Sequence, residues 1–238
     1  MRPVVNRRIN FTSHERPLEW RQYFTAFLGG VMLQKLTRRL RKHAAFRSWL
    51  CGPSYYLHLH THHDAYARNN WLVSELPRLR SLTPSQSILE IGCGNGRFLE
   101  EAAGKWEFVV GADWARAPAL EDVLATHSNV RFCQGNACKL STEDLNVPAD
   151  GFGLVVSADF LEHIGERDLP ALLSKLHSWG KVNFHKIACY DDNHSHLSVL
   201  SSRDWLDLFR ANDPNYRILA ESEREPGKVV IVVTNASE

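Results

Sequence analysis

The chain has 238 residues, 44% of them hydrophobic, which is enough for a full core in one α/β domain with an appendage. No apolar run is long enough to span a bilayer and the N-terminus lacks a secretory signal, so we expect a cytoplasmic protein. The net charge of +1 hides a strongly basic first fifth, because residues 1–50 hold eleven Lys or Arg and only two acids, Glu15 and Glu19. The five cysteines form no CxxC pair, so neither a zinc site nor a disulfide framework is expected.

The basic N-terminal part is predicted to be helical over residues 17–50, where apolar residues recur near helical spacing. Gly29 and Gly30 are expected to divide it into two helices, the second carrying the basic run at 35–43. Such a run is typical of a solvated helix face; the alternative is contact with an anionic membrane surface or a polyanionic substrate. We assign residues 1–80 to a basic helical extension or lid, and residues 81–238 to the ligand-binding domain.

Histidines crowd the next segment, at His58, His60, His62 and His63. On a strand, the first three would share a face and could hold a metal, whereas on a helix they scatter. Asp64 is the only further hard ligand nearby, so we favour polar residues that line a loop or a cleft. Because the segment leads directly into the next predicted element, it could cover a ligand.

After residue 82, strand-like and helix-like segments alternate, a pattern typical of parallel βαβ units. Strands are predicted within 87–96, 107–114, 129–137, 151–164, 181–190, 216–223 and 228–236, and helices within 97–106, 117–127, 168–179 and 201–212. The predicted fold is α/β: a doubly wound, mostly parallel sheet of about seven strands with helices on both faces.

The first of these strands ends in a glycine turn that could hold one of three ligands. A phosphate-binding P-loop is excluded, because the chain has no GxxxxGK followed by Ser or Thr. A dinucleotide site needs GxGxxG, but the third glycine is Gly96, not residue 97, which gives G-x-G-x-G with Gly92 and Gly94. Glu90 lies two residues before the turn, where a carboxylate suits a ligand with a cationic amino or sulfonium group. S-adenosylmethionine carries both groups.

The end of the next predicted strand supports that ligand. Asp113 closes the stretch VVGAD, a position from which a carboxylate can accept hydrogen bonds from both ribose hydroxyls. Trp114 follows it, and its ring could pack on the adenine.

Four stretches in order resemble the motifs of the class I S-adenosylmethionine-dependent methyltransferases: LEIGCGNG, VVGADW, VRFCQGNACKL and FGLVVSADFLEHI, within residues 85–190. In the third, Asn136 stands where the family often has an acid, and an amide can still meet the adenine amino group. The resemblance implies a Rossmann-like fold, S-adenosylmethionine as cofactor, and cofactor contacts from Glu90, Gly92, Gly94, Gly96, Asp113, Trp114, Asn136 and Ser157.

Methyl transfer from a sulfonium is an in-line displacement, so a hydroxyl acceptor needs a base near the pocket. His163, after the fourth strand, is the first candidate, followed by Asp191 and His194 after the fifth. This pairing of His and Asp resembles that in some sugar O-methyltransferases of the family. Some of those enzymes hold magnesium with acids near here, but Asp191 and Asp192 are weak grounds for an ion, and no metal is predicted.

The predicted function is therefore O-methylation of a sugar, in a surface polysaccharide or glycoconjugate, or of a similar polar small molecule. The alternatives are N- or C-methylation of another small molecule, and a non-catalytic partner protein that keeps the fold. No nucleic acid is expected as partner, because the fourth strand is not followed by the Asn/Asp-Pro-Pro-aromatic signature. The basic extension suits peripheral contact with the inner membrane.

Overall fold

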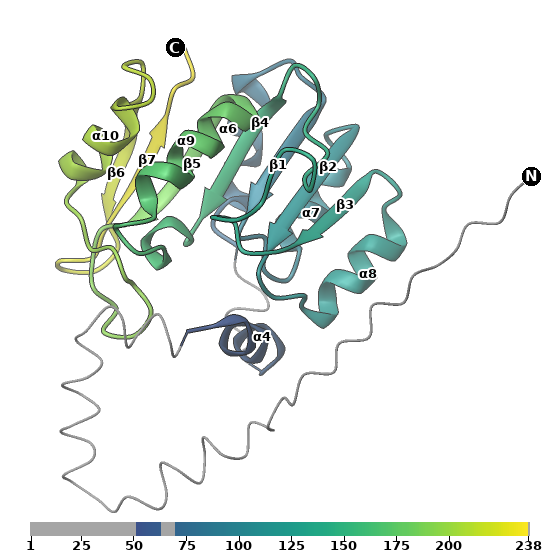
Figure 1. The fold of residues 1–238 in the computed structure, drawn as a ribbon, viewed down its shortest axis with the longest axis horizontal. Helices are drawn as coiled ribbons and strands as arrows, with labels where there is room; N and C mark the ends of the chain where they lie inside the picture. The colour runs from purple at the N-terminus through teal and green to yellow at the C-terminus, as the bar shows by residue number, and fades with distance from the viewer. Residues whose placement is uncertain (1–50, 63–69, 238) are drawn as a thin grey trace, which may run out of the picture. The chain divides into compact units, whose positions relative to one another are not determined.

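A computed structural model describes residues 51–62 and 70–237 (Figure 1). The predicted helices within 17–50, the basic run at 35–43 and His63 lie outside the described residues. Within the part described, no helix is long and apolar enough to cross a membrane.

The described chain forms a seven-stranded sheet in the order β3-β2-β1-β4-β5-β7-β6. β1 to β5 are parallel, and β7 runs antiparallel to both β5 and β6. The strands are β1 (Ser87–Ile91), β2 (Phe108–Asp113), β3 (Val130–Gln134), β4 (Phe152–Ala158), β5 (Gly180–Ala188), β6 (Arg217–Glu223) and β7 (Val229–Thr234). The central strands are buried along nearly their whole length, as expected when helices cover both faces of a parallel sheet. The predicted fold class is confirmed.

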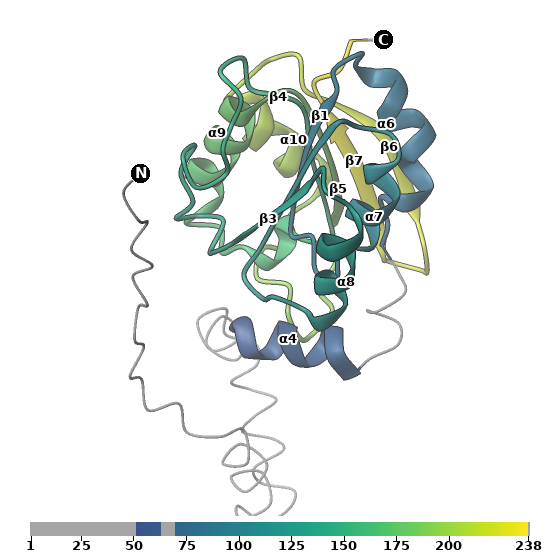
Figure 2. The same ribbon diagram turned by 90° about the vertical axis from the view of Figure 1, so that its right-hand side faces the viewer.

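Helices cover the two faces of the sheet (Figures 1 and 2). One face carries α9 (Leu169–Trp179) and α10 (Ser202–Arg210), and the other carries α6 (Leu76–Leu82), α7 (Arg97–Ala103) and α8 (Pro118–Thr126). Proline in the first turn of α6, α8 and α9 fits the helix start, where its missing N–H costs nothing. Leu72, Leu76 and Leu79 belong to the segment predicted to be an extension. They are buried in the hydrophobic core on the face of the sheet that carries α6, α7 and α8.

The chain leaves the two central strands in opposite directions, which creates the crevice that holds the site. After β1 it enters α7 on one face, and after β4 it passes through the short helix η2 (Leu161–His163) to α9 on the other face. Ligands of doubly wound sheets bind where neighbouring strands diverge in this way. Helix α4 (Pro53–His62) lies beyond this end of the sheet, and the short helix η1 (Val73–Glu75) leads into α6.

Candidate active site

A cavity of about 340 Å³ opens at the carboxyl ends of β1 to β4. Its walls come from the turn after β1, the ends of β2 and β3, the segment after β4, and α4 with the residues before η1. The residues that line it include Tyr56, His60, Asn70, Gly92, Gly94, Asp113, Trp114, Asn136, Asp159, Phe160 and His163.

The glycine turn brings backbone, not side chains, to the wall of the cavity. Gly92 and Gly94 have φ of +78° and +53°, which disfavours residues with a Cβ. A Cβ on Gly94 would lie 2.6 Å from the His60 ring, so helix α4 rests directly on this glycine. Gly96, the third predicted contact, precedes α7 with φ of +79° and does not line the cavity.

Asp113 is locked in place at the end of β2. Its Oδ2 accepts a hydrogen bond from the Gly94 amide and its Oδ1 one from the Ala115 amide, each at 2.8 Å. Burial raises the pKa of Asp113, and these amide bonds oppose that effect. A carboxylate has about four lone-pair sites, so acceptor capacity remains for ligand hydroxyls.

Trp114 and Asn136 also line the cavity; Trp114 directly follows β2, and Asn136 follows the neighbouring strand β3. Trp114 is 40% exposed, which leaves its ring open to a ligand. The Asn136 side-chain oxygen already accepts a bond from the Cys138 amide at 2.9 Å. Both residues predicted to face adenine are therefore at the cavity, Asn136 with one acceptor position in use.

Glu90 does not have the role that the sequence analysis gave it. It is 1% exposed and does not line the cavity; its Oε1 accepts a hydrogen bond from Asn70 Nδ2 at 3.0 Å, and its Oε2 has no partner. Burial raises the pKa of Glu90 to about 8, which favours the neutral form of the side chain. Instead it positions Asn70, which lines the cavity.

Ser157 is also placed away from the ligand. It is fully buried on β4, and its hydroxyl is hydrogen-bonded to His185 Nδ1 at 2.9 Å. Because it is fully buried and does not line the cavity, we correct its predicted cofactor contact to a contact within the core.

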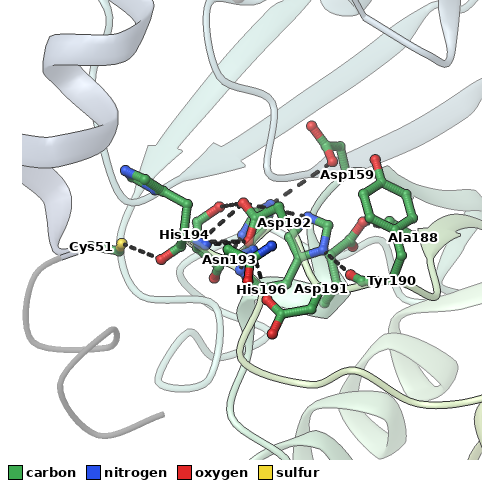
Figure 3. A network of polar contacts seen from close by, with 12 residues as sticks. Cys51, Asp159, Ala188, Tyr190, Asp191, Asp192, Asn193, His194 and His196 are labelled. Carbon is green, nitrogen blue, oxygen red and sulfur yellow. Dashed lines mark hydrogen bonds and ion pairs between the residues drawn. The ribbon is translucent and has the colours of Figure 1, made fainter. Parts of the chain in front are cut away.

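The far end of the cavity, after β4, is polar. His163 Nδ1 donates to the Ser195 carbonyl at 3.2 Å, and its Nε2 lies 4.0 Å from Asp159 Oδ1. Burial lowers the pKa of His163, which the Asp159 charge opposes. His196 packs edge-on against the His163 ring at 5.0 Å. Its own Nδ1 donates to the Tyr190 carbonyl at 2.5 Å (Figure 3).

Asp191 and His194, the other predicted catalytic residues, lie outside the cavity. Both are exposed; Asp191 accepts from the Asn193 amide at 2.8 Å, and His194 Nδ1 is hydrogen-bonded to the Tyr55 hydroxyl on α4, also at 2.8 Å. The structure thus does not bring these two side chains to His163. They shape the loop and connect it to α4.

The neighbouring Asp192 organises that loop. It accepts hydrogen bonds from the amides of His194, Ser195 and His196 and from the Ser195 hydroxyl (Figure 3). Burial alone would raise the pKa of Asp192, but these bonds outweigh burial and lower it. An ionised Asp192 therefore fixes the turn that presents His196.

Sequence reasoning missed Asp159, the first residue after β4. It has φ of +52°, which is uncommon for any residue with a Cβ and is found often at functional sites. Its place at a strand end, four residues before His163, is the feature of the sequence that could have indicated a functional residue.

On α4, His60 lines the cavity as a polar side chain, while His58 and His62 pair on the outer face, with ring centres 4.6 Å apart.

The comparisons with known proteins agree with this geometry. Residues 88–183 match the family described as "Methyltransferase domain". No curated protein matches the chain in sequence.

Solved structures share the fold at low sequence identity. One is the 1,6-didemethyltoxoflavin-N1-methyltransferase of Burkholderia thailandensis, with bound 1,6-didemethyltoxoflavin and S-adenosylhomocysteine: 13% identity, 82% of this chain, 88% of that chain, TM-score 0.61. Another is the N-terminal domain of EvdMO1 with S-adenosylhomocysteine: 16% identity, 74% of this chain, 85% of that chain, TM-score 0.58. A third is the magnesium protoporphyrin IX methyltransferase of Synechocystis PCC 6803: 16% identity, 68% of this chain, 78% of that chain, TM-score 0.51.

The sheet order and the crevice define the fold of the class I S-adenosylmethionine-dependent methyltransferases. Residues 88–183 match the methyltransferase-domain family, and with this match the predicted enzyme class is confirmed.

Proposed function

We propose that this protein transfers the methyl group of S-adenosylmethionine to a hydroxyl oxygen of a polar small molecule, with a sugar as the first candidate. The observation that carries the proposal is the lone pair of His163 Nε2, which faces Asp159 at the cavity wall because Nδ1 is committed to the Ser195 carbonyl. A neutral imidazole held in this way can accept the proton of a hydroxyl.

The residues of the cavity fit the methyl donor. The Asp113 carboxylate has acceptor positions for the ribose hydroxyls, the Gly92 to Gly94 backbone leaves room for close approach, and Trp114 offers a ring for adenine. When bound, the donor supplies a methyl group on a sulfonium; the acceptor oxygen forms the C–O bond as the C–S bond breaks and its electrons pass to sulfur.

The chain's own residues orient the acceptor and exclude water. Phe160 and Tyr56 line the cavity beside His163, and the rings of Tyr56 and His163 meet edge-on at 5.9 Å. Asp159 can accept from a second hydroxyl of the acceptor, which favours a polyol. The choice of a sugar also draws on a solved neighbour, the EvdMO1 domain crystallised in the presence of S-adenosylhomocysteine and D-fucose, with a TM-score of 0.57.

The first test is calorimetric titration with S-adenosylhomocysteine, with NAD as control, followed by transfer of a labelled methyl group to sugars and to amines of similar size. We expect binding of the first ligand alone, transfer to sugars, and a loss of turnover of about 100-fold in His163→Gln with little change in affinity for S-adenosylhomocysteine. The exposed His62→Gln variant is the matched control. Transfer to nitrogen acceptors only would replace this proposal with N-methylation, and binding without transfer would favour the non-catalytic partner.

We also propose a cytoplasmic location, no nucleic-acid partner, and contact of the basic residues 35–43 with anionic lipid. Sedimentation of the full chain with anionic vesicles, but not with neutral ones, is the expected result. Equal sedimentation with both would refute the lipid contact.

A further inference from the structure

Three side chains turn possible metal-ligand atoms toward one point. They lie at the acceptor end of the cavity, the end after β4 where the methyl acceptor is proposed to bind. Asp159 offers a carboxylate oxygen, His163 and His196 each offer a ring nitrogen, and the three atoms lie within 4.8 Å of one another. His163 and His196 are 13% and 4% exposed, so the two imidazoles are well shielded from water.

The hydrogen bonds of the rings determine which nitrogen faces that point. A carbonyl can only accept, so His163 Nδ1 bonded to the Ser195 carbonyl must carry hydrogen, and so must His196 Nδ1 bonded to the Tyr190 carbonyl. In the neutral rings, both Nε2 atoms then hold lone pairs. Histidine ligands of metals usually have this arrangement, in which the second ring nitrogen donates to a carbonyl or carboxylate.

The supporting residues hold the two imidazoles together although they lie 33 positions apart. The Glu162 carbonyl accepts from the amides of both Leu197 and Ser198, at 2.7 and 3.0 Å, which ties the His196 loop to the residue before His163. Glu162 Oε1 also accepts from the Ala188 amide at 2.8 Å. Asp192 fixes the turn on the other side of His196 through the His196 amide at 2.9 Å (Figure 3).

We propose that Asp159, His163 and His196 bind one divalent first-row transition-metal ion whose open coordination positions face the acceptor end of the cavity. Two imidazoles and one carboxylate suit zinc, manganese or iron better than magnesium or calcium, which prefer oxygen ligands. Ligands on one tetrahedral ion with bonds of about 2.1 Å lie roughly 3.4 Å apart, so the three side chains need only close slightly around it.

This inference adds an ion to the proposed function, and it rests on that function for the identity of the acceptor. A hydroxyl bound to the open positions would have a lowered pKa and lose its proton to water, so that the oxygen attacks as an alkoxide. His163 then acts as a ligand and the ion replaces it in activating the hydroxyl. A zinc ion with three protein ligands can expand from four to five coordination, and the second position that this opens favours acceptors with two adjacent oxygens.

The test uses the full chain, stripped of metal with a chelator. Titration calorimetry with Zn²⁺ measures affinity, and Co²⁺ added to the same protein reports nitrogen and oxygen ligands through its visible absorption. We expect one tight ion per chain, binding at least tenfold weaker in Asp159→Asn, and loss of the Co²⁺ band in His196→Gln. Asn adopts positive φ readily, so Asp159→Asn removes a charged ligand and keeps the backbone.

The matched control is His58→Ala with His62→Ala, which removes the other histidine pair of the described residues and leaves the triad intact. We expect this double variant to keep the tight ion, and thermal melts verify that each variant is folded. Equal affinity in the wild type and Asp159→Asn, or loss of the tight ion only in the double variant, overturns the site.

The inference and the proposed function can fail separately. Methyl transfer to a hydroxyl that continues unchanged in a chelator keeps the proposed function and overturns the role of the ion. A tight ion at the triad without transfer to any hydroxyl acceptor supports the site and overturns O-methylation.

Discussion

At the scale of single residues, Asp113 carries the most specific expectation. Its carboxylate is fixed by the Gly94 and Ala115 amides, so it meets a ligand without a large entropic cost. We expect Asp113→Ala to weaken S-adenosylhomocysteine binding by about 3 kcal/mol, roughly 100-fold, because charged hydrogen bonds to the ribose are lost. Calorimetry measures the change, with Asp122→Ala, on the exposed part of α8, as control. Equal affinities would refute the ribose assignment.

The titration of Glu90 should make the free energy of unfolding depend on pH. Burial holds its pKa at about 8 in the folded chain, against 4.5 when solvated, so the folded state binds the proton more tightly than the unfolded state. Stability therefore falls as pH rises between these values, by up to about 1.4 kcal/mol per pH unit, and the dependence ends above the folded pKa.

The variant Glu90→Gln keeps an acceptor for Asn70 and removes the titration. We expect its stability, relative to the wild type, to rise between pH 5 and pH 8. Urea unfolding of the ligand-free proteins across this range measures the difference. Parallel pH profiles would show that Glu90 is ionised in the folded protein.

At the scale of elements, α4 and the glycine turn form one unit. A Cβ at residue 94 would meet the His60 ring at 2.6 Å and strain a backbone with φ of +53°. We expect Gly94→Ala to weaken S-adenosylhomocysteine binding by at least tenfold, since both the turn and α4 must shift. In Gly94→Ala with His60→Ala, part of that loss should return, because the steric conflict is gone and only the backbone strain remains. Additive effects in the double-mutant cycle would show that α4 and the glycine turn do not interact, which would contradict this expectation.

The strands and the mostly parallel α/β sheet were predictable from the sequence, but which strand residues reach the ligand was not. Asp113 ends β2 and the glycines follow the end of β1, where the chain must turn toward the crevice. Glu90 and Ser157 lie inside strands that are covered on both faces, so no polar and apolar alternation shows which side they face.

The loop after β5 shows a second limit of sequence reasoning. His194 and His196 are two residues apart, yet only His196 joins the cluster, because Asp192 gathers three successive amides into a turn. Which histidine turns inward depends on those hydrogen bonds, and neither periodicity nor composition indicates them.

At the scale of the molecule, the segment before β1 is part of the core. Leu79 on α6 is fully buried, whereas Leu57 on α4 is 39% exposed. We expect Leu79→Ala to lower the free energy of unfolding by about 2–5 kcal/mol, and Leu57→Ala by less than about 1 kcal/mol. Urea denaturation tests both. A small loss at Leu79 would indicate a lid that separates from the sheet.

The two hydrogen bonds that the Glu162 carbonyl accepts limit local opening of the loop after β5. Leu197 and Ser198 lie in a loop without regular secondary structure, where amide protons ordinarily exchange with solvent quickly. Here both amides are bound to a residue that is itself buried and anchored to β5, so their deuterium exchange should be as slow as that of Ala188 at the end of that strand. This wall of the cavity would then open only together with the end of β5, which lies between β4 and β7 inside the sheet.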